Sequence, residues 1–174
     1  MRDWWLRTVL VLVAPRPVFV ALRDESEQSL SDRAEPVLAV VLLAGMSLAL
    51  ASHASRGYDS LDLAVWTFIA GGITGTFAYW LLGAVLYGAG RALGSLGSYR
   101  RARHVLAFAC VPLALCLVFA PVGSHRFSYF ALVFLAWSAA LLAIGVRAVH
   151  GWGWPRAFAV TLAPIAVAVA LVAI

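Results

Sequence analysis

Residues 63–89 have the sequence LAVWTFIAGGITGTFAYWLLGAVLYGA, which contains no charged side chain. A helix needs about 20 consecutive apolar residues to cross a bilayer, and a longer stretch can cross at a tilt. This stretch exceeds that length. Residues 63–89 are therefore predicted to form a tilted transmembrane helix.

The composition of the whole chain supports a membrane protein. Of its 174 residues, 63% are hydrophobic and 12% are charged, whereas a soluble domain has about 25% charged residues. The net charge of +5 comes from arginines that flank the apolar stretches. Membrane topology and lipid headgroups explain this charge better than nucleic-acid binding does.

Four further stretches are also apolar and close to the length of a membrane span. The predicted fold class is therefore all-α, an integral membrane bundle of five transmembrane helices. An N-terminal cytoplasmic segment (residues 1–35) precedes a membrane domain (residues 36–174). Pro36 is placed in the first turn of the first span. The predicted spans cover residues 36–52, 63–89, 105–122, 128–144 and 155–174.

The N-terminal segment has an apolar stretch, residues 8–14, that is too short to cross a bilayer. Trp4 and Trp5 precede it, and Pro15 and Pro17 end it. We expect an interfacial amphipathic helix here, because tryptophan favours the membrane interface. The acidic and polar residues 23–35 are expected to form a solvated connector.

The arginines test this topology independently of hydropathy. The N-terminal segment has five, the loop after the second span has four and the loop after the fourth span has two, while Arg56 and Arg126 lie on the opposite side. Positive residues favour the cytoplasmic side. The distribution predicts an odd number of spans, a cytoplasmic N-terminus and an exported C-terminus. All basic residues except histidine are arginine, which suggests a GC-rich bacterial genome and a location in the inner membrane.

The second span is rich in glycine, a residue that lets helix backbones approach closely. The candidate face serves either a partner or another copy of the chain, or else packing within the bundle. It comprises Gly71, Gly72, Gly75, Gly83, Gly90 and Gly94.

Two further groups of side chains are expected at the membrane surface. Tyr99, Arg100, Arg101 and Arg103 form the densest basic cluster, which we interpret as a topology signal or as a surface for anionic lipid or a partner. The predicted interface anchors are Trp4, Trp5, Trp152 and Trp154.

Groups that carry chemistry are scarce in the predicted spans. No acid, base or histidine lies in the middle of a span, and the histidines are expected at span ends or in loops on alternating sides: His53, His104, His125 and His150. We therefore expect no catalytic residues, no metal and no cofactor. Pro112 and Pro164 are interpreted as helix kinks, with a broken-helix binding site as the alternative.

Three segments have patterns that occur together in one known family. Residues 15–23 (PRPVFVALR) precede the first span, and residues 94–112 combine glycines, Tyr99 and arginines with a helix that contains Pro112. Residues 156–160 (RAFAV) open the last apolar helix. Together these segments resemble the Yip (Ypt/Rab-interacting protein) domain family in its bacterial form, including its members with five spans.

This resemblance implies a role as a membrane scaffold. Eukaryotic relatives act in vesicle traffic and bind Rab-type GTPases and one another. The present chain has only a short N-terminal segment where those relatives bind partners, so GTPase recognition is not transferred to it. The leading hypothesis is a non-enzymatic scaffold or adaptor that binds lipid and other membrane proteins or itself. The alternative is a small transporter, channel or transporter-accessory subunit, and an enzyme acting on lipid is a third hypothesis.

Overall fold

The computed structural model describes residues 2–53, 60–122 and 124–173, and every element in these ranges is a helix. The elements are α1 (Arg2–Leu10), α2 (Pro15–Ala21), α3 (Glu27–His53), α4 (Ser60–Ala92), α5 (Tyr99–Ala109), α6 (Val111–Leu115), the 3₁₀ helix η1 (Cys116–Val122), α7 (Ser124–His150) and α8 (Trp154–Ala173).

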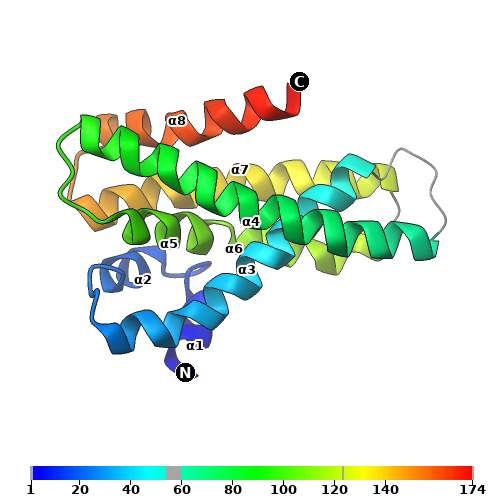
Figure 1. Ribbon diagram of the computed structural model, residues 1–174, viewed down its shortest axis with the longest axis horizontal. Coiled ribbons are helices and arrows are strands. Elements are labelled where there is room, and N and C mark those ends of the chain that lie inside the picture. Colours follow the sequence, from blue (N-terminus) through cyan, green and yellow to red (C-terminus); the bar gives the residue numbers. More distant parts are fainter. Residues whose placement is uncertain (1, 54–59, 123, 174) are drawn as a thin grey trace.

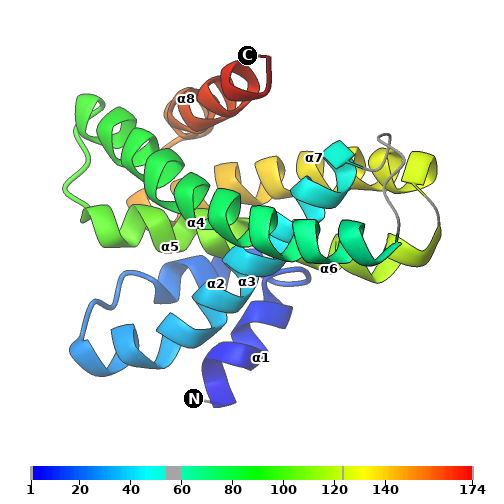
Figure 2. The same ribbon diagram turned by 45° about the vertical axis from the view of Figure 1, so that its right-hand side comes forward.

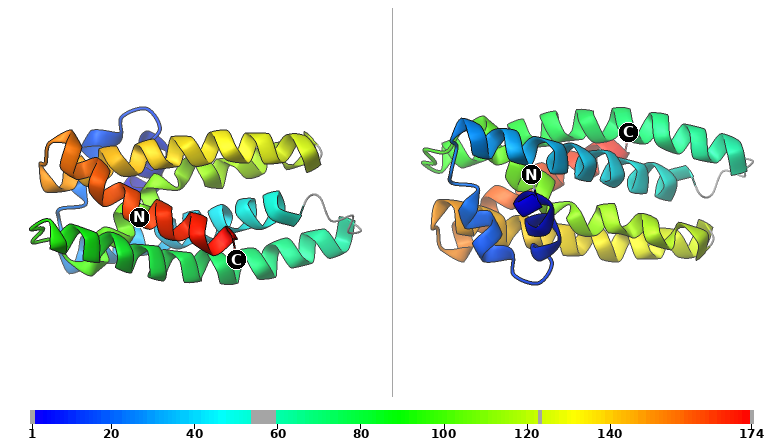
Figure 3. Two further views of the ribbon diagram at one scale, coloured as in Figure 1. Left: turned by 90° about the horizontal axis from the view of Figure 1, so that it is seen from above. Right: turned by 90° about the horizontal axis from the view of Figure 1, so that it is seen from below.

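Long helices lie side by side along the longest axis of the molecule (Figure 1). They form two groups. In the first group α3 packs against α4, and in the second α7 packs against α5, α6 and η1 (Figure 3). Helix α8 packs on α4 and α7, and Figure 2 shows it diverging from the rest of the bundle toward the C-terminus. The short helices α1 and α2 cover one end of the bundle on the side opposite α8.

Three helical segments are long and apolar enough to cross a membrane: Glu27–Ser52, Ala64–Ala92 and Arg126–His150. A fourth candidate is the pair Tyr99–Ala109 and Val111–Ala120, which bends by 41° at its break. The apolar segment Trp154–Ala170 of α8 is shorter than these. A helical membrane bundle with three or four candidate spans is therefore supported.

Helix α3 begins earlier than the sequence predicted. The Ser26 carbonyl accepts the first helical hydrogen bond from Leu30 at 2.9 Å, and the Ser26 hydroxyl caps the Ser29 N–H. Pro36 lies inside this helix and not in its first turn. The expected solvated connector is thus helical from Glu27 onward, because the Ser26 cap starts the helix before the proline.

The N-terminal segment forms two short helices, not the single interfacial helix that was expected. Pro15 occupies the first turn of α2, where its missing N–H costs nothing. Val18, Phe19 and Leu22 are buried, and α2 packs against α7. Leu6 and Val9 of α1 remain exposed. The segment is consequently an integral part of the helical core that also presents an apolar face outward.

The two predicted proline kinks have different outcomes. The chain breaks at Cys110, between α5 and α6, and Pro112 lies in the first turn of the new helix α6. Pro112 therefore lies at the start of a new helix, next to the 41° bend that the sequence predicted as a kink. Pro164 lies inside α8, which continues past it to Ala173.

Candidate functional site

Charged and polar side chains gather at the end of the bundle where α4 joins α5 and α7 joins α8. We call this region the arginine-rich end and define it by Arg23, Glu25, Arg33, Ser98, Arg100, Arg101, Arg103, His104 and His150. These residues come from the segment between α2 and α3, from α3, from α5 with the residue before it, and from α7. Segments that were assigned to one side of the membrane thus meet at one end.

Two glycines end the helices that lead into this region. Gly94 has a φ of +87°, and the N–H of the following Ser95 donates to the Gly90 carbonyl at 2.9 Å. Gly151 has a φ of +69°, and its N–H donates to the Arg147 carbonyl at 2.9 Å. Both positions adopt the left-handed conformation that glycine allows. The two helix ends are therefore fixed by local sequence.

Arg23 joins the N-terminal segment to the end of α7. Its Nη2 donates to the Ala148 carbonyl at 2.5 Å, and its Nε donates to the Val149 carbonyl at 3.0 Å. These carbonyls belong to the last turn of α7, where no helical N–H is available and a cation is favoured. Arg23 thus acts as a charged C-cap across a long sequence separation.

Glu25 joins the same segment to the start of α5. Arg101 Nη2 lies 3.0 Å from Glu25 Oε2, and the Ser98 hydroxyl donates to Glu25 Oε1. The Ser98 hydroxyl also accepts from the Arg101 N–H at 3.0 Å, which makes Ser98 the N-cap of α5. Arg101 additionally donates to the Arg23 carbonyl at 3.2 Å. One carboxylate therefore organises both a helix cap and an ion pair.

Arg103 is enclosed by aromatic rings. Its guanidinium carbon lies 3.6 Å from the ring centre of Trp80, 4.6 Å from that of Tyr99 and 5.1 Å from that of Tyr79. Such cation–π contacts contribute most where the cation is desolvated. A side chain at Gly83 would overlap the stem of Arg103, so this glycine makes room for the arginine.

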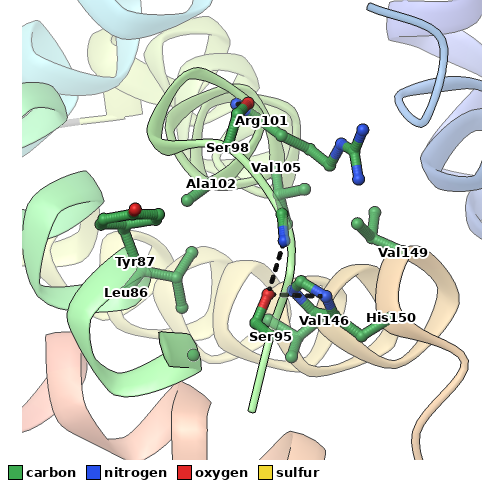
Figure 4. Close-up of a pocket in the computed structure, with 12 residues that line it drawn as sticks. Leu86, Tyr87, Ser95, Ser98, Arg101, Ala102, Val105, Val146, Val149 and His150 are labelled. Carbon is green, nitrogen blue, oxygen red and sulfur yellow. Dashed lines mark hydrogen bonds between the residues drawn. The ribbon is translucent and has the colours of Figure 1, made fainter. Parts of the chain in front are cut away.

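A small cavity of about 20 Å³ lies between α4, α5 and α7. Figure 4 shows Ser95 next to His150, with the Ser95 hydroxyl 3.2 Å from His150 Nδ1 and accepting from the Gly97 N–H at 3.0 Å. The His150 ring stacks on Trp152 at 4.4 Å between ring centres. A cavity of this size holds about one water molecule.

Among the arginines that the structure describes, Arg33 has an unusual environment, because it is fully buried. Its side chain is 0% exposed, and Nε, Nη1 and Nη2 have no hydrogen-bond partner among the described residues. Its guanidinium carbon lies 5.5 Å from the ring centre of Trp4. Trp4 is 4% exposed and packs against Phe108. The prediction of Trp4 as an interface anchor is therefore wrong, because α1 folds back onto α3 and α5.

The remaining predicted surface residues are found at several depths. Arg100 is exposed, Arg101 and Tyr99 are half-buried, and Arg103 is buried. Trp5 and Trp154 are exposed and Trp152 is half-buried, so these three remain candidate anchors. His104 is buried in α5, which corrects the expectation of a solvated histidine. Arg56 lies outside the described residues, as do the side chains of His53 and His125.

The predicted glycine face divides into three groups, apart from Gly83, which makes room for Arg103. Gly71 and Gly75 pack directly on α3: a Cβ at Gly71 would lie 2.6 Å from Met46 Cα, and one at Gly75 would lie 2.6 Å from the Val41 carbonyl oxygen. Gly72 and Gly90 have only side chains nearby, at ordinary contact distances. Gly94 has no neighbouring atom and does not belong to a packing face, because it terminates α4.

The sequence contained a signal for the burial of Arg33 that was not used. Val37, Val40 and Ala44 follow Arg33 at helical spacing, and all three are buried. If the helix is started at the Ser26 cap, Arg33 falls on this apolar face. Glu25 and Arg23 had no comparable signal, since their partners lie far along the chain.

A comparison with models of known protein families identifies the family of this chain. The Yip1 domain matches residues 9–174, which includes α2 and every long helix. The chain belongs to the Yip1 domain family.

This match confirms the family resemblance over most of the chain, and it begins within the segment assigned to residues 1–35. The Yip1 domain family is related to membrane trafficking, and its members are generally not enzymes. The apolar helices agree with a Yip1 family membrane protein. No curated protein and no solved structure matches the chain.

Proposed function

We propose that this Yip1 family chain is a non-enzymatic scaffold or adaptor of a bacterial inner membrane. It would bind other membrane proteins or a second copy through contacts between helices, and anionic lipid through its arginine-rich end. The observation that carries this proposal is a shallow, open depression on the surface of α4, which we call the groove, lined by Gly72, Ile73, Thr76, Phe77 and Trp80.

The groove lies beside the glycines that α4 uses internally. Gly71 and Gly75 face α3, whereas Thr76 and Phe77 are exposed on the outside of the bundle. Gly72 and Thr76 are four residues apart, the spacing at which two small side chains let a second helix approach closely. The neighbouring aromatic side chains of Phe77 and Trp80 would border that helix.

Replacement of Gly72 by leucine tests the groove. A Cβ at Gly72 would lie 3.7 Å from the Leu42 side chain, an ordinary contact, so Gly72→Leu is expected to fold and to fill the groove. Gly88→Leu is the matched control, because Gly88 lies on the same helix and faces open space.

The measurement is gentle purification of the tagged full chain from native membranes, with mass spectrometry and chemical crosslinking. We expect a stoichiometric membrane-protein partner or a crosslinked dimer with the native chain and Gly88→Leu, and its loss with Gly72→Leu. A native chain that is purified alone and does not self-associate would contradict the scaffold.

The proposed orientation has five spans, with the N-terminus and the arginine-rich end in the cytoplasm and the C-terminus exported. The support is the positive-inside distribution together with the meeting of Arg23, Arg101 and the end of α7 at one end of the bundle. Replacing Arg100, Arg101 and Arg103 by glutamate should disturb insertion or orientation. Unchanged reporter activity at the C-terminus after these replacements would contradict this role.

A small transporter, channel or transporter-accessory subunit remains the alternative. The break of 41° between the α5 and α6 segments favours it, since broken helices form binding sites in transporters. The measurement is flux of ions and small solutes through vesicles that contain the purified chain. Flux above that of empty vesicles would favour transport over the scaffold.

A further inference from the structure

Arg33 is a permanent cation that lacks a bonding partner in the described part of the chain. All three of its guanidinium nitrogens are buried and unpaired. A guanidinium does not lose its charge at any pH that proteins experience. Burial of such a charge is costly unless a counter-charge and hydrogen-bond acceptors accompany it. Since the described residues supply no hydrogen-bond acceptor to this guanidinium, an acceptor from a bound group would stabilise it.

The two carboxylates that act most strongly on Arg33 have hydrogen-bond partners elsewhere. Glu25 and Asp24 lie within electrostatic range of Arg33. The Glu25 carboxylate pairs with Arg101 and accepts from Ser98, and Asp24 Oδ1 accepts from the Ser26 N–H at 3.0 Å. That hydrogen bond also lowers the pKa of the Asp24 carboxyl. Neither carboxylate contacts the guanidinium of Arg33.

Positive charges also act on Arg33, although less strongly than Glu25 and Asp24 do. Arg100 and Arg101 lie within its electrostatic range, and the guanidinium carbon of Arg7 lies 4.7 Å from the centre of the same Trp4 ring. The aromatic ring offers a partial compensation for cations. It provides no acceptor in the plane of the guanidinium, where the N–H groups point. Among the described residues, no other group accepts a hydrogen bond from these nitrogens.

A second buried polar side chain is His104 of α5. His104 is within electrostatic range of Arg33, and its Nδ1 is buried without a hydrogen-bond partner in the described residues. In the tautomer that has its proton on Nδ1, this nitrogen is a donor, so α3 and α5 would each supply an unsatisfied donor. A tetrahedral phosphate group matches the guanidinium fork through two parallel hydrogen bonds and has further oxygens for a second donor.

We propose that Arg33 and His104 bind the phosphate group of a small anion between α1, α3 and α5, with Trp4 covering it. The source of the phosphate is either an anionic lipid headgroup or free phosphate. Arg33 lies near the N-terminal end of the candidate span Glu27–Ser52, before the apolar part of α3 that starts at Pro36, and the ends of a span are where headgroup phosphates are expected. Helix α1 must move outward to admit the anion.

This site differs from the surface cluster at the start of α5. Arg101 is paired with Glu25 and Arg103 is enclosed by aromatic rings. Their contribution to lipid binding would be diffuse and sensitive to salt. Arg33 would instead bind one anion with a fixed stoichiometry.

The test uses the full chain in lipid-free maltoside micelles, which contain no phosphate. One arm measures radiolabelled inorganic phosphate by equilibrium dialysis, and the other measures retained phosphatidylglycerol by native mass spectrometry. Arg33→Met removes the charge and keeps an unbranched apolar side chain. Arg16→Met is the matched control, because Arg16 is an exposed residue of α2.

We expect the native chain and Arg16→Met to bind about one equivalent of anion in at least one arm, and Arg33→Met to bind at least about tenfold more weakly. The arm that shows binding identifies the source. Absence of stoichiometric binding by the native chain in both arms would overturn the proposal. Equal binding by Arg33→Met would do the same.

Thermal unfolding separates a ligand site from a structural role. Without anion, Arg33→Met should unfold at a higher temperature than the native chain, since it relieves an uncompensated buried charge. The anion should stabilise the native chain and not Arg33→Met. A lower unfolding temperature of Arg33→Met in anion-free micelles would count against the proposal. If Arg33→Met does not fold, Arg33→Lys keeps the charge without the fork, and binding equal to the native chain would overturn the proposal.

Discussion

The crossing of α3 and α4 and the arginine-rich end stabilise the bundle in opposite ways. At the crossing, Gly45 of α3 meets Gly71 and Gly75 of α4, and the backbones touch without intervening side chains. At the arginine-rich end, long charged side chains reach from one element to another. The first region depends on shape alone, whereas the second depends on charge and on specific hydrogen bonds.

This difference determines how each region should respond to mutation. A close-packed backbone contact has no means of relaxing, so a single methyl group is too much. A network of half-buried charges can lose one member while water replaces part of the lost interaction. We therefore expect the largest effects at the crossing and progressively smaller effects toward the exposed part of the network.

The largest loss of stability is predicted for Gly45→Ala. Its Cβ would lie 2.7 Å from Gly75 Cα and would overlap the Gly71 carbonyl oxygen, so α3 and α4 must separate. Overpacking of this kind costs about 3 kcal/mol or more. The measurement is the stability of the purified chain in detergent, obtained from reversible unfolding or from the temperature of thermal unfolding.

Gly88→Ala provides the control for that experiment. Gly88 lies in α4 and faces open space, so its Cβ meets no atom within 4 Å. Because alanine is the better helix former, this variant should be as stable as the native chain or gain up to about 1 kcal/mol. Equal destabilisation by the two variants would show that the crossing is not the weak point.

The same contrast explains which features the sequence predicted. Apolar stretches and glycine spacing are local properties, so they indicated the membrane helices and a close contact of α4. They did not distinguish Gly71, which faces α3, from Gly72, which faces the groove. The predicted start of α3 at Pro36 is wrong, because the Ser26 cap starts the helix earlier, and this longer helix brings Arg33 onto the buried face.

The residue pairs at the arginine-rich end could not be predicted from the sequence. Arg23 bonds to carbonyls of residues 148 and 149, and Glu25 bonds to Ser98 and Arg101. Such pairs form only when the tertiary fold brings distant segments together. The sequence placed these segments on one side of the membrane but carried no information about which charge would meet which partner.

An intermediate effect is predicted for Arg23→Met. The change removes two charge-assisted hydrogen bonds to the last turn of α7 and keeps an apolar stem of similar length. We expect a loss of about 2 kcal/mol. Amide exchange near the end of α7 should accelerate, because the loss of the C-cap frees this turn to fray. Arg16→Met, on the exposed face of α2, should leave both quantities unchanged.

The smallest effect is predicted for the ion pair between Glu25 and Arg101. The side chains are 33% and 20% exposed, respectively, so water screens part of their attraction. A double-mutant cycle with Glu25→Gln and Arg101→Gln should give a coupling energy of about 1 kcal/mol at low salt. The coupling should decrease as salt is raised, because mobile ions screen exposed charges. A coupling that persists unchanged at 1 M salt would place this pair, like the glycine crossing, among contacts held by fixed geometry, and the contrast between the two regions would fail.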